Sequence, residues 1–68
     1  MKLTIVVNKD GSLFGGYCVE VPGSNGQGET EEECVSDVIE AARLLLEYRR
    51  EEAWKEGRHV LVREMADA

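Results

Sequence analysis

The clearest structural signal in this 68-residue chain is the start of a long helix at residues 28–33. Thr30 is a good N-cap residue, and Glu33 follows it by three positions, which is the spacing of a capping box. The two glutamates between them fall in the first turn, where the helix dipole favours negative charge. Apolar residues then recur at helical spacing, and Gly57 is suited to the C-cap. The pattern predicts one helix over residues 31–56.

Apolar side chains cover a wide part of this predicted helix. One stripe comprises Cys34, Val38, Ala41, Leu45 and Tyr48, and the stripe beside it comprises Val35, Ile39, Ala42 and Leu46. At about 100° per residue the two stripes cover roughly half of the circumference, more than one sheet contact needs. We therefore expect the first stripe to pack on a sheet and the second to form the interface of a dimer or tetramer. The final strand or the tail could cover the second stripe instead.

The residues before the helix alternate between apolar and polar side chains, as strands do. Residues 1–8 have a period of two, residues 8–12 are rich in turn formers, and a second strand is expected over 13–21. A short third strand is possible at 25–28, and a last one is expected at 58–63. The fold class expected is α+β, a small antiparallel sheet of three to four strands with one long helix packed on it. The order is β-β-β-α-β.

Two groups of glycines are expected to shape the backbone. Gly15 and Gly16 suggest a bulge or a late start to the second strand. The glycines of residues 23–28 are expected to allow positive φ in a tight connection. This stretch is not a phosphate loop, because no Lys-Ser/Thr follows it and carboxylates at the helix start would repel phosphate.

The length of the chain allows one domain over residues 1–68. A core of this size supplies ~3–5 kcal/mol of stability, so self-association is the expected further source. Cys18 and Cys34 lack metal-ligand spacing and fit buried thiols of a reduced, cytoplasmic protein better than a disulfide. The apolar runs are too short to span a bilayer, and residues 1–4 lack the design of a signal peptide.

The negative charge of the chain is concentrated at the helix start. Residues 29–40 contain six acids and no base, whereas the rest of the chain has eight of each, so the formal charge of −6 lies here. We expect these acids to bind a basic partner. They are Glu29, Glu31, Glu32, Glu33, Asp37 and Glu40. Consecutive glutamates point in different directions around a helix, so no metal site is expected here. Because the chain is acidic, it is not expected to bind nucleic acid directly.

No arrangement of residues predicts catalysis or a cofactor. His59 is the only histidine, and no serine or cysteine lies in a recognised nucleophile motif, so an exposed strand histidine is expected. The enzyme alternative is a small hydrolase that uses the acidic cluster and a metal. Trp54 falls on the polar side of the helix, where it could pack under the last strand or mark an interface.

Taken together, the motifs resemble those of the HicB-like antitoxin family over about residues 1–56. A strand ends in Pro22-Gly23, residues 24–27 follow, and Gly28-Glu29-Thr30-Glu31-Glu32-Glu33 opens a long amphipathic helix. The family usually has a longer turn followed by Cys, a position that Ser24 occupies here.

The resemblance implies a partial ribonuclease-H-like fold and dimers or higher oligomers. It also implies a partner, a small basic RNA-cleaving toxin of the HicA type, whose basic surface the acidic chain would cover. Nuclease activity is not implied, because the first strand offers no acid. Members of the family often add a DNA-binding module, for which residues 1–68 leave no room, so none is expected. The alternative is a stand-alone HicB-like oligomeric domain that binds another protein or a small ligand.

Overall fold

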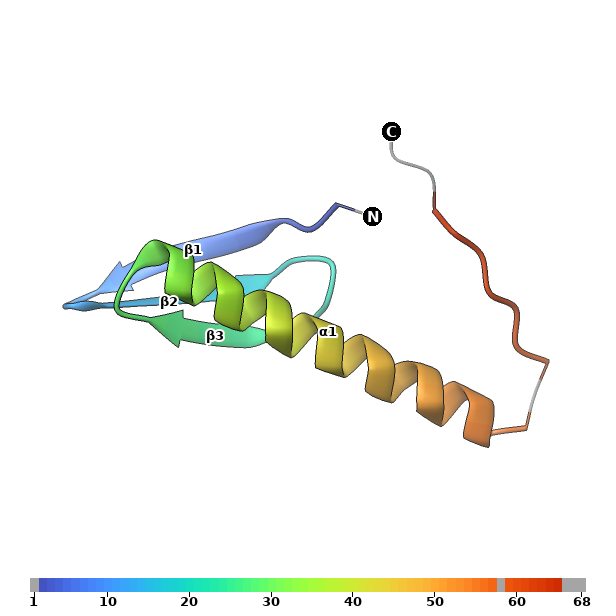
Figure 1. The fold of residues 1–68 in the computed structure, drawn as a ribbon. Coiled ribbons are helices and arrows are strands. Elements are labelled where there is room, and N and C mark those ends of the chain that lie inside the picture. Colours follow the sequence, from blue (N-terminus) through green and yellow to red (C-terminus); the bar gives the residue numbers. More distant parts are fainter. Residues whose placement is uncertain (1, 58, 66–68) are drawn as a thin grey trace.

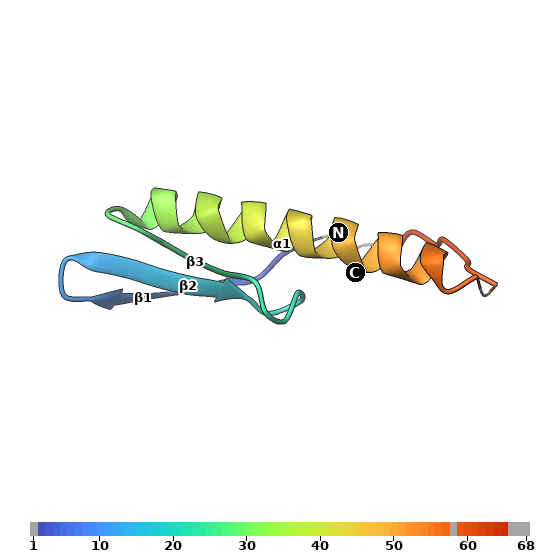
Figure 2. The same ribbon diagram turned by 90° about the horizontal axis from the view of Figure 1, so that it is seen from below.

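The protein folds into one sheet covered on one face by one helix. The computed structural model describes residues 2–57 and 59–65, with the elements β1 (Ile5–Asp10), β2 (Leu13–Cys18), β3 (Asn25–Gly28) and α1 (Glu31–Lys55). The strands form an antiparallel sheet in the order β1-β2-β3, and α1 lies across it (Figures 1 and 2). The α+β class predicted from the sequence is confirmed, with three strands.

The hairpin of β1 and β2 turns through a two-residue loop that begins at Gly11. Asp10 pairs with Leu13 across this loop, and Gly11 has a φ of +64°, which only glycine adopts readily. A glycine with positive φ at the first position is typical of a type II′ turn, whose twist matches that of the strands. The register continues without a break along both strands. The irregularity predicted at Gly15-Gly16 was therefore wrong.

The second strand ends at Cys18, earlier than predicted, because a compact turn follows. The N–H of Val21 donates to the carbonyl of Cys18, and the N–H of Ser24 donates to that of Val21. The buried Ser24 hydroxyl donates to the same Val21 carbonyl at 2.6 Å. Arg49, near the end of α1, donates to the carbonyl of Pro22 at 2.7 Å. The turn is thus joined to the helix that lies above it.

The predicted N-cap at Thr30 is confirmed, but the Glu33 carboxylate bonds to the residue before the cap and not to the cap residue itself. The Thr30 hydroxyl accepts a hydrogen bond from the N–H of Glu33 at 3.1 Å, and the Glu33 carboxylate accepts one from the N–H of Glu29 at 2.9 Å. At 1.5 Å per residue the 25-residue helix is about 37 Å long, so it exceeds the six-residue strands. Its last turns therefore extend beyond the sheet (Figure 2).

The close packing of α1 on the sheet depends on glycines of β2 and β3 that lie under the helix. A Cβ built on Gly26 would lie 2.6 Å from the backbone nitrogen of Val38, and one on Gly28 would lie 2.7 Å from that of Cys34. Gly16, the partner of Gly26, also faces the helix. The backbone of α1 therefore lies directly on β3, with no layer of side chains between them.

This arrangement corrects the expectation for residues 23–28. Only Gly23 has a positive φ there, of +91°. Gly26 and Gly28 are required for the close approach of the helix and not for an unusual backbone conformation.

The core consists mainly of small side chains. Its buried apolar members are Cys18, Val21, Cys34, Val38 and Ala42. Half-buried residues that pack against it are Leu3, Ile5, Val7, Phe14, Leu45 and Leu46. Both cysteines are buried free thiols, as predicted.

Two residues of the predicted helix stripes lie elsewhere. Ala42, expected in the oligomer interface, is 1% exposed and belongs to the core, because α1 turns positions 34, 38 and 42 toward the sheet. Tyr48, expected on the sheet-facing stripe, is 60% exposed because the helix has passed the end of the sheet there.

Residues 59–65 do not form the predicted last strand. They pair with no strand within the described ranges, and Arg58 lies outside those ranges. The segment runs back from the end of α1, beside the helix and on its β1 side (Figures 1 and 2). Leu61 and Val62 are 63% and 72% exposed. Strand propensity reflects packing against neighbouring side chains, which these exposed residues lack.

Candidate protein-binding surfaces

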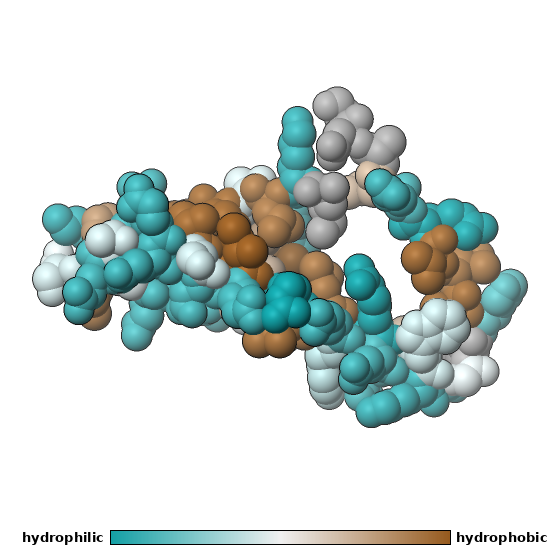
Figure 3. Space-filling view, in the orientation of Figure 1, coloured by the Kyte–Doolittle hydropathy of each residue, from teal (hydrophilic) through white to brown (hydrophobic). Residues whose placement is uncertain are grey.

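Helix α1 has two flanks of different chemistry. Asp37 and Glu33 contact β3, so the flank on that side carries carboxylates. The opposite flank, toward β1, carries Val35, Ile39 and Leu46, which we call the apolar flank. Figure 3 shows a band of hydrophobic side chains between β1 and the helix.

Two of the six predicted acids attach the helix start, one to β3 and the other to the connection that follows β3. The Asp37 carboxylate accepts a hydrogen bond from the N–H of Gln27 at 2.9 Å, and that of Glu33 accepts one from the N–H of Glu29. Hydrogen bonds to ionised carboxylates are stronger than neutral ones. These two acids therefore position the helix, and each keeps a second oxygen for a partner.

A third acid, Glu40, belongs to a surface network with Arg43. The guanidinium donates to Glu40 through Nε at 3.2 Å and Nη2 at 2.5 Å, and through Nη1 to Glu47 at 2.7 Å. The hydrogen bond and charge of Arg43 lower the pKa of Glu40, and the same pair raises the pKa of Arg43. Glu47 offsets the positive charge of Arg43, so the network of Glu40, Arg43 and Glu47 keeps the net negative charge of one carboxylate.

The other three acids have free carboxylates. Glu29, Glu31 and Glu32 are exposed, and their side chains make no hydrogen bond or ion pair with the described part of the chain. Glu31 and Glu32 line a shallow hollow together with Val35, Ser36 and Ile39. A second hollow on the β3 side is lined by Gln27, Glu32, Glu33, Ser36, Asp37, Ile39 and Glu40. The helix start therefore presents carboxylates around an apolar centre.

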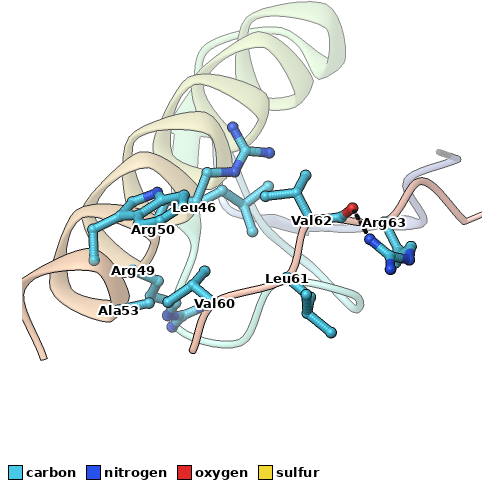
Figure 4. Close-up of a pocket in the computed structure, with 9 residues that line it drawn as sticks. Leu46, Arg49, Arg50, Ala53, Val60, Leu61, Val62 and Arg63 are labelled. Carbon is cyan, nitrogen blue, oxygen red and sulfur yellow. Dashed lines mark hydrogen bonds between the residues drawn. The ribbon is translucent and has the colours of Figure 1, made fainter. Parts of the chain in front are cut away.

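A groove at the other end of α1 was not predicted. It lies between the last turns of the helix and the extended tail (Figure 4), and its lining is Leu46, Arg49, Arg50, Ala53, Trp54, Val60, Leu61, Val62 and Arg63. The lining contains three arginines and no acid. Trp54 is 59% exposed, so its own chain does not bury it. The sequence signal was the pair of arginines that interrupts the apolar stripe.

The described residues hold no metal-binding cluster. Within residues 2–57 and 59–65 no group of three or more His, Cys, Asp or Glu is placed to hold a metal ion. His59 is exposed as predicted, but it does not lie in a strand. No helix of these ranges is long and apolar enough to cross a membrane.

Comparisons of the chain with protein-family models, with curated proteins and with solved structures give no match. The resemblance to the HicB-like family therefore rests on the residues that suggested it, Pro22-Gly23 and residues 28–33.

Proposed function

We propose that this protein is a non-catalytic, HicB-like antitoxin-type module that captures a small basic RNA-cleaving protein and covers its basic surface. The observation that carries the proposal is the cluster of free carboxylates of Glu29, Glu31 and Glu32 at the start of α1. Glu31 and Glu32 line the same hollow as Val35 and Ile39, which supply apolar contact area there.

The geometry suits capture by electrostatic steering. Glu31 and Glu32 lie in the first turn of α1, and Glu29 lies just before its N-cap. Asp37 joins this end of the helix to β3, and Glu33 joins it to Glu29. A fixed patch of one charge sign accelerates the association of an oppositely charged partner, and salt weakens this effect. The apolar centre then provides the burial on which a stable complex depends.

The first experiment identifies the partner. A tagged form of the chain is purified from the native cell, and the co-purified proteins are identified by mass spectrometry. The proposal expects a small basic protein that cleaves RNA in vitro and stops doing so when this chain is added. Recovery of neutral or acidic partners would contradict the proposal, and recovery of this chain alone would favour the stand-alone oligomeric domain.

The second experiment tests the patch with a charge-matched control. The double variant Glu29→Gln/Glu31→Gln removes two free carboxylates, and Asp10→Asn/Glu64→Gln removes two exposed acids elsewhere. At low salt we expect the association rate to fall about tenfold for the first variant and to change little for the control. Equal rates for the two variants would show that the patch does not steer the partner.

A further inference from the structure

We propose that the groove between the last turns of α1 and the tail, residues 59–65, binds an extended acidic segment of another protein (Figure 4). The carboxylates of this segment meet the arginines of the groove, its apolar side chains cover the exposed apolar ones, and its backbone pairs with the tail. The groove lies at the opposite end of α1 from the acidic helix start, so this inference does not depend on the function proposed above.

The groove carries positive charge that the rest of the described chain does not neutralise. Its lining contains Arg49, Arg50 and Arg63 and no acid, although the whole chain has a formal charge of −6. None of these three arginines has a carboxylate partner in the described part of the chain, whereas Arg43 bonds to two carboxylates. A guanidinium binds a carboxylate through two parallel hydrogen bonds, so the groove is suited to acidic side chains from outside.

Arg50 is the most available of these arginines. Its guanidinium makes no hydrogen bond or ion pair with the described residues. Glu47 and Glu52, on the same part of the helix, pair with other cations of α1. Glu32 at the helix start is about five turns, or roughly 27 Å, from Arg50 along the helix. Because this separation is about three Debye lengths at physiological salt, the acidic helix start does not cancel the charge of the groove.

Exposed apolar side chains share the groove with the arginines. Trp54 on the helix wall is 59% exposed, and Leu61 and Val62 on the tail wall are 63% and 72% exposed. Tryptophan and arginine are the residues that most often carry the binding energy of protein interfaces. The lining therefore fits a ligand that has both acidic and apolar residues.

The dimensions of the groove set the length of the ligand. From Leu46 to Trp54 the helix wall rises about 12 Å. At 3.3 Å per residue, about four residues of an extended chain span this wall. The volume of the groove is about 620 Å³, which lies within the usual range of ligand sites, ~300–1,000 Å³.

The tail supplies backbone groups for pairing. It runs beside α1 as an extended chain (Figure 1), and the N–H groups of residues 60–63 make no hydrogen bond within the described ranges. Val60 and Val62 have high strand propensity but lack neighbours to pack against. An extended ligand supplies both the pairing partner and these neighbours. Residues 60–63 therefore become a strand only when the groove is occupied.

A peptide fits this groove better than a nucleic acid does. Both offer anionic groups to arginine, but a peptide strand also has the regularly spaced N–H and C=O groups that pair with the tail. A nucleic acid carries one charge per phosphate along its length, so the net charge of −6 repels it more strongly than a short peptide.

The fluorescence of Trp54, the only tryptophan of the chain, reports on the groove directly. The probe is a capped peptide of about six residues in which aspartate and valine alternate, so that it covers the helix wall. The control peptide has asparagine in place of aspartate. The emission of Trp54 should shift and saturate with the aspartate peptide, and the asparagine peptide should bind about tenfold more weakly. Equal affinity for the two peptides, or no change in emission with either, would overturn the proposal.

Variants that remove one charge test both walls of the groove. Arg50→Gln on the helix wall and Arg63→Gln on the tail wall should each weaken binding of the aspartate peptide about tenfold. Lys55→Gln removes the same charge from the same end of α1 but lies outside the lining, so its affinity should change less than about twofold. An equal loss in all three variants would show unspecific attraction and would refute the site.

Amide hydrogen exchange tests the backbone pairing. In the peptide complex, alternate N–H groups of residues 60–63 should exchange more slowly than in the free protein, and unchanged exchange would contradict strand formation.

The same fluorescence assay tests two other occupants. Oligouridylate that binds as tightly as the aspartate peptide would make the groove a nucleic-acid site. A shift of the emission with protein concentration alone would make a second copy of this chain the occupant. Either result would rule out the acidic peptide as the ligand for which the groove is built.

Discussion

Replacing Gly26 by alanine should destabilise the protein, because the added methyl group meets the backbone of α1. The new Cβ would lie 2.6 Å from the nitrogen of Val38 and 2.9 Å from the carbonyl carbon of Asp37. Both atoms belong to the helix backbone, so no side-chain rotation can relieve the contact. The first turns of α1 must move away from β3, and the Asp37 bond to the sheet is stretched with them.

The magnitude follows from the cost of overpacking a core, which is about 1–3 kcal/mol. A small domain has only a few kcal/mol of stability, so a loss of ~2 kcal/mol removes a large fraction of it. With a urea dependence of about 1 kcal/mol per molar, the unfolding midpoint should fall by ~2 M. Far-ultraviolet circular dichroism at one protein concentration gives this midpoint.

Gly15 provides the matched control in the same sheet. A Cβ there meets only the carbonyl oxygen of Gly26, at 4.0 Å, and points away from the helix. Because glycine in a strand costs roughly 0.5–1 kcal/mol relative to alanine, Gly15→Ala should be neutral or slightly stabilising. Equal losses for both variants, or an unchanged midpoint for Gly26→Ala, would refute the idea that the helix backbone rests on this glycine.

Three further predictions concern single hydrogen bonds. Thr30→Ala removes the helix N-cap and should lower the free energy of unfolding by about 1 kcal/mol in urea titrations. Thr30→Ser keeps a capping hydroxyl and should retain most of the stability that the cap contributes. Ser24→Ala removes a buried hydroxyl bonded to a carbonyl and should cost about 1–2 kcal/mol by the same measurement. Hydrogen bonds from Thr4 lower the pKa of Glu20 below its usual value of 4.5. The stability that these bonds contribute is therefore fully present above pH 4.5 and is lost as the pH falls through the lowered pKa. Glu20→Gln should therefore make the urea midpoint less dependent on pH in that range, and an unaltered pH profile would contradict this.

Features that depend on neighbouring residues in the sequence were predictable. The bond between Thr30 and Glu33 spans three positions, and the turn at Gly11 is fixed by the residues on either side of it. The helix was expected over 31–56 and occupies Glu31–Lys55. Local chemistry of this kind acts the same way in any fold that contains the segment.

Features that depend on distant contacts were not predictable in the same way. Gly26 and Gly28 resemble turn glycines in the sequence, and only the position of α1 shows that their missing side chains make room for the helix. Glu33 and Asp37 look like two more charges in an acidic run, yet each accepts a backbone hydrogen bond near β3. Residues 58–63 have the composition of a strand, but strand propensity depends on packing against neighbours, and Leu61 and Val62 are exposed.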